Sequence, residues 1–174
     1  MPHKKDSPIV ETAEQTGLPL PLLESPSFQL ERLRRRTRDG VEAALSTHDT
    51  TMREYWVLTC LIEGDAASQS ALSEALAIDA SDMVRLIDAL ESKGWARRER
   101  DPKDRRRQIV TSTKAGAKAQ GELAVLVAQA EKTALDDSTG KQRKHLRKLT
   151  QAVLTTESAE AHPERPDGPV AKGA

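Results

Sequence analysis

Residues 101–107 read Asp-Pro-Lys-Asp-Arg-Arg-Arg and connect two short segments, 96–100 and 108–112, that have the length of strands. The Asp-Pro pair favours a turn, because proline fixes φ and the aspartate side chain can bond to the backbone that follows. Ile109 and Val110 mark the second strand, since β-branched residues favour strands. We therefore predict a two-stranded hairpin, or wing, whose tip carries several guanidinium groups. Each strand is too short to be stable alone and must pack on neighbouring helices.

The wing region concentrates positive charge in a chain that is neutral as a whole. Residues 93–107 contain eight basic and three acidic residues, a net charge of +5, whereas the full chain has 27 of each kind. Such a local excess is an electrostatic footprint for a negatively charged partner, and a narrow hairpin tip suits DNA. The alternative is a solvated basic turn that has no partner.

Two short helices joined by a tight turn precede the wing. The first begins at Ser68 or Ser70, and residues 78–80 form the turn. The second ends at Gly94, the residue type that most often follows the last turn of a helix. Its apolar positions are Met83 or Val84, then Ile87 and Leu90. Two helices of this size around a three-residue corner predict a helix-turn-helix.

Longer helices flank this motif, so the predicted fold class is mainly α. They are expected over 27–46, from Thr50 or Thr51 to just before Gly64, from Thr113 to about Leu135, and over about 139–155. The apolar face of the second of these comprises Met52, Tyr55, Trp56, Thr59 and Ile62, widened by Leu58 and Leu61. The apolar stripes of the outer helices exceed what one thin winged domain can cover. A second copy of the chain is the simplest way to bury these stripes. The alternative is a monomer whose outer helices fold back on the domain.

The two ends of the chain are rich in turn-forming residues and poor in apolar periodicity. We predict a flexible arm over 1–25, with a short ordered piece around 18–23, and a disordered tail over 156–174. No apolar run reaches membrane-spanning length, and no apolar block follows the first five residues, so we expect a cytoplasmic protein without membrane contact. The lone cysteine, Cys60, fits a reducing compartment and is expected to pack as a small hydrophobe rather than act in redox chemistry.

The order of these elements resembles the MarR family of bacterial winged helix-turn-helix regulators. The strongest likeness lies in 78–94, Ile-Asp-Ala-Ser-Asp-Met-Val-Arg-Leu-Ile-Asp-Ala-Leu-Glu-Ser-Lys-Gly, and in 101–106, Asp-Pro-Lys-Asp-Arg-Arg. The resemblance implies one domain over 26–155 with flanking dimerisation helices and a DNA-binding core over 51–112. It also implies a homodimer that regulates transcription. We expect a repressor that binds a palindromic operator, lies with the nucleoid through DNA, and is released by a small aromatic or lipophilic effector.

The N-terminal half of the second helix of a helix-turn-helix enters the major groove. The resemblance further implies that Arg106 enters the minor groove and that Asp104 helps to hold it there. Arg105 and Arg107 are expected to contact phosphates or solvent. The complete set of residues expected to contact DNA is Gln69, Ser70, Ser81, Asp82, Val84, Arg85, Asp104, Arg105, Arg106 and Arg107.

Two positions depart from the family, in which many members have hydroxyl residues at the sites of Asp82 and Val84. An acid there repels phosphate and can accept only from a cytosine amine, whereas Val84 can touch a thymine methyl group. Arg85 has three open roles: donating two hydrogen bonds to guanine, binding a phosphate, or pairing with Asp82 or Asp88. The operators of relatives therefore do not transfer to this chain.

The resemblance places an effector pocket where the N-terminal helix, the Tyr55–Trp56 helix, the wing domain and the long C-terminal helix meet. The residues expected to line it are His48, Met52, Arg53, Tyr55 and Trp56. For Tyr55 and Trp56 plain core packing is the alternative, and for His48 a capping or surface position.

Two other classes of function stay open at this point. An enzyme is disfavoured because the sequence has no glycine-rich phosphate loop, no Ser/His/Asp set and no ligand-spaced histidines, so we expect no metal and no cofactor. A winged-helix module for protein or RNA contacts, without ligand control, fits the same elements and needs no palindromic duplex.

Overall fold

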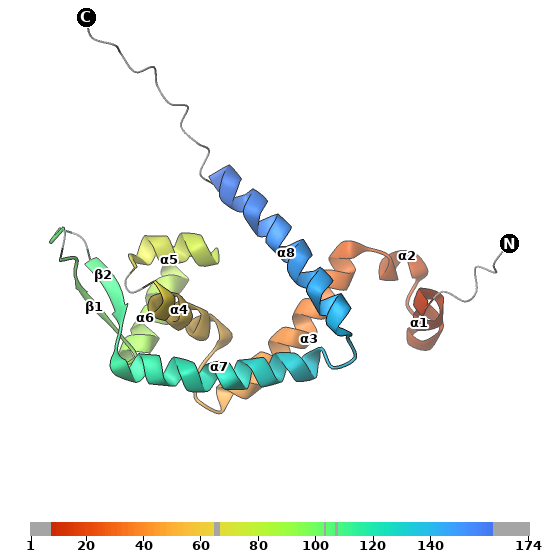
Figure 1. Cartoon of the computed structure of the whole chain (residues 1–174), viewed down its shortest axis with the longest axis horizontal. Coiled ribbons are helices and arrows are strands. Elements are labelled where there is room, and N and C mark those ends of the chain that lie inside the picture. Colours follow the sequence, from red (N-terminus) through yellow and green to blue (C-terminus); the bar gives the residue numbers. More distant parts are fainter. Residues whose placement is uncertain (1–7, 65–66, 103, 107, 162–174) are drawn as a thin grey trace, which may run out of the picture. The chain divides into compact units, whose positions relative to one another are not determined.

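The computed structural model describes residues 8–64, 67–102, 104–106 and 108–161 (Figure 1), with side chains described up to residue 156. The chain divides into two units, with the boundary after Ala134. The first unit holds helices α1 to α7 and both strands, and the second holds α8 (Gly140–Ala161). No helix in the described stretches combines the length and the hydropathy needed to cross a membrane.

The helix-turn-helix core has the three helices that the sequence predicts, α4 (Met52–Glu63), α5 (Gln69–Leu76) and α6 (Ala80–Ser92). Each helix begins after a residue whose side chain accepts a hydrogen bond from a backbone N–H of the first turn, namely Thr51, Ser68 and Asp79. At the end of α5, Ala77 adopts a left-handed conformation with φ of 48° and makes the turn into α6. At the end of α6, Gly94 has φ of 70°, as the predicted helix end requires.

The wing has the bounds that the sequence predicts, with β1 at Ala96–Arg100 and β2 at Gln108–Ser112. The strands pair antiparallel, and Arg98 lies opposite Val110. An isolated β-bridge joins Val110 of β2 to Ala67. The Val110 nitrogen lies 2.8 Å from the Ala67 carbonyl oxygen, and the Ala67 nitrogen lies 3.1 Å from the Val110 carbonyl oxygen. Val110 and Ala96 are buried against the helices. This packing supplies the support that such short strands need.

The long helices α3 (Pro26–Ser46) and α7 (Lys114–Ala134) pack along each other within the first unit. Gly40 of α3 lies at their contact, where an added Cβ would be 3.9 Å from both the Ala130 carbonyl oxygen and the Ala134 Cβ. A glycine inside a helix costs about 1 kcal/mol relative to alanine. The packing of α3 on α7 offsets this cost.

Both ends of the chain contain more helix than expected. Helices α1 (Pro8–Thr16) and α2 (Leu20–Leu23) lie within the segment that was expected to be a flexible arm, and α8 continues to Ala161 instead of ending near 155. Of the prolines that argued for an irregular arm, Pro8, Pro19 and Pro21 stand at or beside helix starts, where the missing N–H is tolerated, and Pro2 lies outside the described residues. Residues 1–7 and 162–174, which complete the predicted arm and tail, lie outside the described residues.

The core lies where α3, α4, α6 and α7 meet the wing, and its largest fully buried side chains are Leu45, Val57, Leu58, Leu61, Met83, Ile87, Leu90 and Leu123. On α6 the buried residue is therefore Met83 and not Val84. On α4 the predicted apolar face is right for Leu58 and Leu61, which are buried. It is wrong for Trp56, which is 39% exposed, and it left out the buried Val57. Helix α4 is apolar around most of its circumference, and periodicity alone cannot choose the face of such a helix.

The start of α7 lies directly on the backbone of Trp95. The N–H of Thr113 donates to the Trp95 carbonyl at 3.0 Å, and the Thr113 hydroxyl donates to the Gly94 carbonyl at 2.7 Å. The same hydroxyl oxygen accepts from the N–H of Gly116 at 3.0 Å, which caps α7. A Cβ at Gly116 would lie 2.1 Å from the Trp95 carbonyl oxygen, closer than a side chain allows. Only glycine fits at position 116 without a backbone shift.

We expect Gly116→Ala to lower the free energy of unfolding by about 2 kcal/mol or more, because the added methyl group forces the backbone of α7 away from Trp95. Gly121→Ala in the same helix is the matched control, since nothing lies within 4 Å of its Cβ position. This control is expected to raise the free energy of unfolding by up to about 1 kcal/mol. Denaturant unfolding followed by circular dichroism, at one protein concentration, measures both. Equal stabilities for the two variants would show that the contact with Trp95 does not restrict position 116.

Candidate nucleic-acid interface

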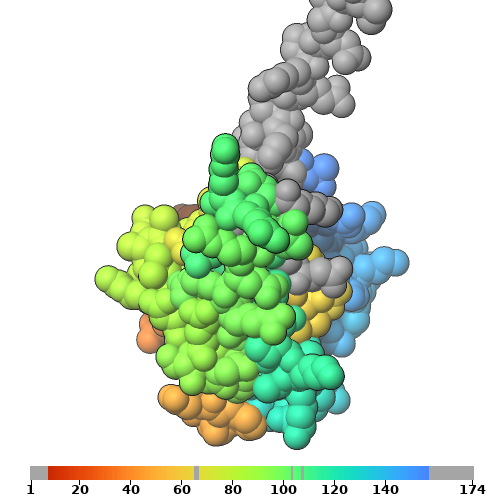
Figure 2. All heavy atoms as spheres, turned by 90° about the vertical axis from the view of Figure 1, so that its left-hand side faces the viewer, coloured from red at the N-terminus to blue at the C-terminus, as the bar shows by residue number. Residues whose placement is uncertain are grey.

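Helix α6 and the wing share one face of the first unit. Figure 2 shows the yellow-green segment of α6 and the green segment of β1 side by side on this face, and the tip of the wing rises above them. Four residues predicted to face DNA, namely Ser81, Asp82, Val84 and Arg85, lie on the exposed or half-exposed side of α6, with Met83 and Ile87 buried behind them. The helix therefore separates a core face from a polar outer face near its N-terminus.

Asp82 holds two arginines at once. Its Oδ1 accepts from Nη1 of Arg85, one turn further along α6, at 3.1 Å, and its Oδ2 accepts from Nη1 of Arg53 in α4 at 3.2 Å. Of the three open roles for Arg85, the structure thus contains the intramolecular pair with Asp82. The Arg85 side chain is 78% exposed, and ion pairs at such positions are worth at most about 1 kcal/mol. The pair can therefore exchange for a contact with another negative group.

The hydroxyl of Ser81 is committed to the cap of α6. Both the backbone N–H and the hydroxyl of Ser81 donate to Oδ1 of Asp79, at 2.8 and 2.6 Å. The hydroxyl bond, followed by the backbone bond, holds the pKa of Asp79 below its ordinary value. The Ser81 hydroxyl already donates its proton to Asp79. The expected contact of Ser81 with DNA could therefore use the hydroxyl oxygen only as an acceptor.

The predicted contacts at the start of α5 are also accessible. Ser70 is exposed and Gln69 is half-buried. The Ser70 hydroxyl lies 3.1 Å from the hydroxyl of Ser68, which in turn accepts from the N–H of Ala71 at 3.2 Å. This arrangement leaves polar groups at the first turn of α5 within reach of a phosphate.

The wing tip is organised by its acids. Oδ1 of Asp104 accepts from the backbone N–H of Arg106 at 3.0 Å, and Oδ1 of Asp101 accepts from the N–H of Asp104 at 3.4 Å. Arg105 and Arg106 have exposed side chains, and Nη1 of Arg100 donates to the Arg105 carbonyl at 3.1 Å. Asp104 thus bonds to the backbone of the tip, and its role in holding the Arg106 side chain at DNA stays a prediction. Arg107 lies outside the described residues.

Two of the eight basic residues counted over 93–107 point into the fold instead of outward. Nη1 of Arg98 lies 2.7 Å from Asp88 and also bonds to Glu91, whose other oxygen accepts from the Arg98 backbone N–H at 2.6 Å. The charge available to a partner is therefore smaller than the sequence count indicates. The sequence places Asp88 and Glu91 three residues apart on one helix face, but only the packing of the wing on α6 determines which cation meets them.

Lys93 is the second inward cation. Its ammonium lies 2.9 Å from Oε1 of the buried Glu54, donates to the Asp49 carbonyl, and lies 5.3 Å from the centre of the Trp95 ring. Glu54 also accepts from the N–H of Thr51 at 2.7 Å through its other oxygen, completing a capping box. These contacts fix the end of α6 to the beginning of α4.

A hollow of about 400 Å³ lies between α3, α4 and α7. Three residues predicted to line an effector pocket, Met52, Tyr55 and Trp56, do line it. Sequence reasoning missed the remaining lining, which is Arg34, Thr37, Arg38, Val41, Ala124, Val127, Ala128 and Glu131. These residues come from helices distant in sequence, so only the packing of α3 on α7 brings them to α4.

The other two predicted pocket residues lie elsewhere. Arg53 lines a second hollow of about 760 Å³ that extends from α3 and α4 to Asp82, Arg85 and Leu86 of α6. His48 lines neither hollow and is exposed in the turn after α3, with its Nδ1 2.9 Å from the Thr47 hydroxyl. His48 therefore lies at the surface, which is the alternative that the sequence left open for it.

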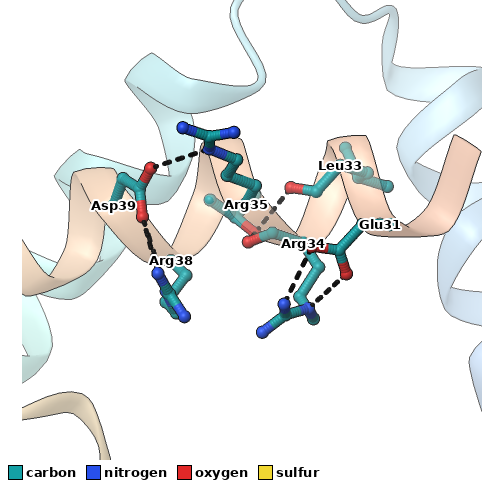
Figure 3. A network of polar contacts seen from close by, with 7 residues as sticks. Glu31, Leu33, Arg34, Arg35, Arg38 and Asp39 are labelled. Atoms are coloured by element: carbon teal, nitrogen blue, oxygen red, sulfur yellow. Dashed lines mark hydrogen bonds and ion pairs between the residues drawn. The ribbon is translucent and has the colours of Figure 1, made fainter. Parts of the chain in front are cut away.

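Helix α3 brings a row of arginines to these hollows (Figure 3). Arg34 and Arg38 point to the same side of the helix, and Arg35 points to the other. Two nitrogens of Arg34 donate to the two oxygens of Glu31, each at 2.9 Å, and these bonds lower the pKa of Glu31. Asp39 lies 3.3 Å from Arg38 and 3.8 Å from Arg35. Arg34 and Arg38 each line both hollows.

Cys60 packs against the core as a partly buried residue, as the sequence predicts. Burial raises the pKa of its thiol, which keeps the sulfur protonated and a weak nucleophile at neutral pH. Among the described residues, no group of three or more His, Cys, Asp or Glu side chains could hold a metal ion.

Comparisons with known proteins agree with this fold. Residues 50–107 match the model of the MarR family. Transcriptional regulator HosA of Escherichia coli O111:H- is 33% identical over 70 residues, which are 40% of this chain and 52% of HosA. The chain spans about half the length of the curated relatives that it matches.

Two solved structures are similar over a longer range. A mutant of MarR from E. coli in complex with operator DNA is 25% identical, with a TM-score of 0.65 over 72% of this chain and 91% of that chain. CouR from Rhodococcus jostii RHA1 bound to p-coumaroyl-CoA is 24% identical, with a TM-score of 0.69 over 84% of this chain and 98% of that chain. The match over 50–107 covers the helix-turn-helix and most of the wing, and the fold around them is the fold of these structures. Residues 50–107 therefore form a MarR-family winged helix-turn-helix segment within this chain.

Proposed function

We propose that the protein is a transcriptional regulator that binds a palindromic operator as a homodimer and is released by a small-molecule effector. The observation that carries the proposal is the shared face of α6 and the wing, where Arg85, Arg105 and Arg106 are exposed while Arg98 and Lys93 are used to hold the face together. The solved MarR complex with operator DNA and the name of HosA support the same function. No catalytic step, metal or cofactor forms part of the proposal, and the protein is expected to work in the cytoplasm.

In this function α6 enters the major groove with its N-terminal turn foremost. Arg85 leaves Asp82 for a guanine edge or a phosphate, and Val84 reaches a thymine methyl group. The wing places Arg106 in the minor groove, where narrow A·T-rich steps attract a guanidinium group. Gln69, Ser70, Arg105 and Arg107 contact the phosphate backbone and set the register.

Apolar side chains that are exposed among the described residues support the proposed dimer. In α8, Leu149 is 58% exposed and lies on one stripe with Leu146 and Val153. Leu30 of α3 and Val125 of α7 are also largely exposed. Isolated exposed leucines are common on proteins, but a stripe along a helix marks a surface that another chain covers. A second copy of this chain is the proposed partner.

The hollow between α3, α4 and α7 is the proposed effector site. Met52, Tyr55, Trp56, Val41 and Val127 give it an apolar lining, and Arg34 and Arg38 add positive charge. A volume of about 400 Å³ lies within the range of small-molecule sites. CouR bound to p-coumaroyl-CoA shows that a protein of this fold accepts an aromatic ligand, so an aromatic or lipophilic effector is proposed here as well.

A gel shift with the duplex that flanks its own gene tests the proposal. Binding of a palindrome as a dimer supports the regulator. Binding of single strands or RNA alone would favour a winged-helix module of another kind, and binding of no nucleic acid would favour a protein-contact module.

Arg106→Ala is expected to weaken operator binding at least tenfold, about 1.4 kcal/mol, since it removes a cation from the minor groove. Arg97→Ala is the matched control, because Arg97 is exposed on β1 but already paired with Glu99 at 3.2 Å. This control is expected to lose less than about threefold. Fluorescence anisotropy at near-physiological salt measures both, and sedimentation confirms that the dimer is intact. Unchanged affinity for Arg106→Ala would contradict the role of the wing.

A footprint on the operator is expected to protect two half-sites about 10 base pairs apart, centre to centre, because a two-fold dimer places its two helices one helical turn apart. Hydroxyl-radical cleavage gives the spacing. Protection of a single half-site at saturation would contradict a symmetric dimer.

Leu149→Glu is expected to shift the protein toward the monomer by at least tenfold in the dimer dissociation constant, since a charge would be buried in the interface. Gln151→Glu, on the opposite side of α8 and exposed, is the matched control and should leave the dimer unchanged. Analytical ultracentrifugation of both variants checks this. A dimer of wild-type strength for Leu149→Glu would place the interface elsewhere.

A further inference from the structure

The two hollows adjoin each other through shared walls. Arg34, Arg38, Met52 and Trp56 line both. The first hollow is mainly apolar and ends at α7, whereas the second reaches the N-terminal half of α6, the helix proposed to read DNA. Any group bound across this shared wall would lie within reach of Arg53, which lines the second hollow.

We propose that Arg53 couples the hollows to the DNA-reading helix by sharing the carboxylate of Asp82 with Arg85, and that an effector with an anionic group withdraws Arg53 from this carboxylate. The inference rests on the proposed function and adds to it the chemistry of the effector and the residue that transmits its binding. Arg53 acts here as a positioning residue, because it touches Asp82 and not DNA.

The geometry of Asp82 supports a shared carboxylate. Its two oxygens are divided between two guanidinium groups at similar distances, 3.2 Å to Arg53 and 3.1 Å to Arg85. Arg53 is 55% exposed and Asp82 41% exposed, so neither bond is protected from solvent. Exposed pairs of this kind are weak, and the loss of one strengthens the other without a large energetic cost.

The pairing of the Asp82 carboxylate determines how strongly α6 binds DNA in this proposal. While Arg53 holds Asp82, a second cation offsets the carboxylate and Arg85 can leave it for a base or a phosphate. When Arg53 is engaged elsewhere, Asp82 retains Arg85 and presents uncompensated negative charge to the phosphates. Loss of Arg53 from Asp82 therefore weakens DNA binding, although Arg53 makes no DNA contact.

The lining of the two hollows indicates the chemistry of the effector. An aromatic or acyl group fits between Met52, Tyr55 and Trp56, and a carboxylate or phosphate on that group meets Arg34, Arg38 or Arg53. Guanidinium groups bind such anions through two parallel hydrogen bonds, which are stronger than neutral ones. The nearby carboxylates of Asp39 and Asp82 are themselves exposed and can give up their arginines to the ligand.

A double-mutant cycle on operator affinity tests the relay without a ligand. Arg53→Met is expected to weaken binding by about threefold to tenfold in the wild-type background and by less than about 1.5-fold in the Asp82→Asn background. Arg34→Met is the matched control, because it removes the same charge from the same hollow but from an arginine that pairs with Glu31 of its own helix. It is expected to weaken binding by less than about twofold. An equal loss for Arg53→Met in both backgrounds, or a loss equal to that of Arg34→Met, would overturn the relay.

A matched set of probes tests the ligand chemistry at constant ionic strength. We expect 2-naphthoate or 2-naphthyl phosphate at millimolar concentration to weaken wild-type binding to the operator at least threefold, and the neutral 2-naphthamide to leave it unchanged. The response should disappear in Arg53→Met and Asp82→Asn, and the two anions distinguish a carboxylate from a phosphate ligand. An equal effect of the amide, a full response of Arg53→Met, or no effect of either anion on the wild type would overturn the anionic effector.

Two results distinguish failure of the proposed function from failure of the inference about Arg53. Wild-type protein that binds no duplex overturns the proposed function and the inference together. Wild-type protein that binds its operator, while Arg53→Met behaves like Arg34→Met, overturns the inference alone.

Discussion

The position of the wing against α6 depends on one arginine. Arg98 of β1 bonds to Asp88 and Glu91 of α6 through its side chain and to Glu91 through its backbone N–H. Because the side chain is largely buried, removing any partner would leave a charge in a site that water reaches poorly. A hairpin of two five-residue strands has little stability of its own, so these bonds hold it against α6 as part of the face that the two elements share.

The ion pairs of this fold divide into two kinds with different roles. Arg98 and Lys93 are turned inward, where their partners hold α6 to β1 and to α4. Arg53, Arg85, Arg34 and Arg38 have exposed partners and can exchange them at low cost. A protein that must both keep a rigid shape and respond to DNA or a ligand needs both kinds. Burial, and not residue type, decides which role an arginine takes.

Sequence reasoning located the elements well because their signals are local. The bounds of both strands, the caps at Thr51 and Thr113 and the end of α6 at Gly94 depend on residues within a turn of each other. The buried face of α4 and the inward turn of Arg98 depend on which distant helix packs where, and no local pattern contains that information. The same holds for the hollow beside Trp56, most of whose lining comes from α3 and α7. The proposed DNA contacts stay predictions until they are tested with DNA.

The start of α7 is fixed to the backbone of Trp95, so the helix can act as a lever. Its 21 residues span about 30 Å, so a tilt of about 5° at the end that packs on α3 displaces the other end by nearly 3 Å. Because Thr113 bonds to Gly94 and Trp95 and Gly116 lies against Trp95, such a displacement is passed to the end of α6 and the base of the wing. In the proposed dimer, a small change in the contact between the two subunits would therefore appear, enlarged, in the separation between their α6 helices.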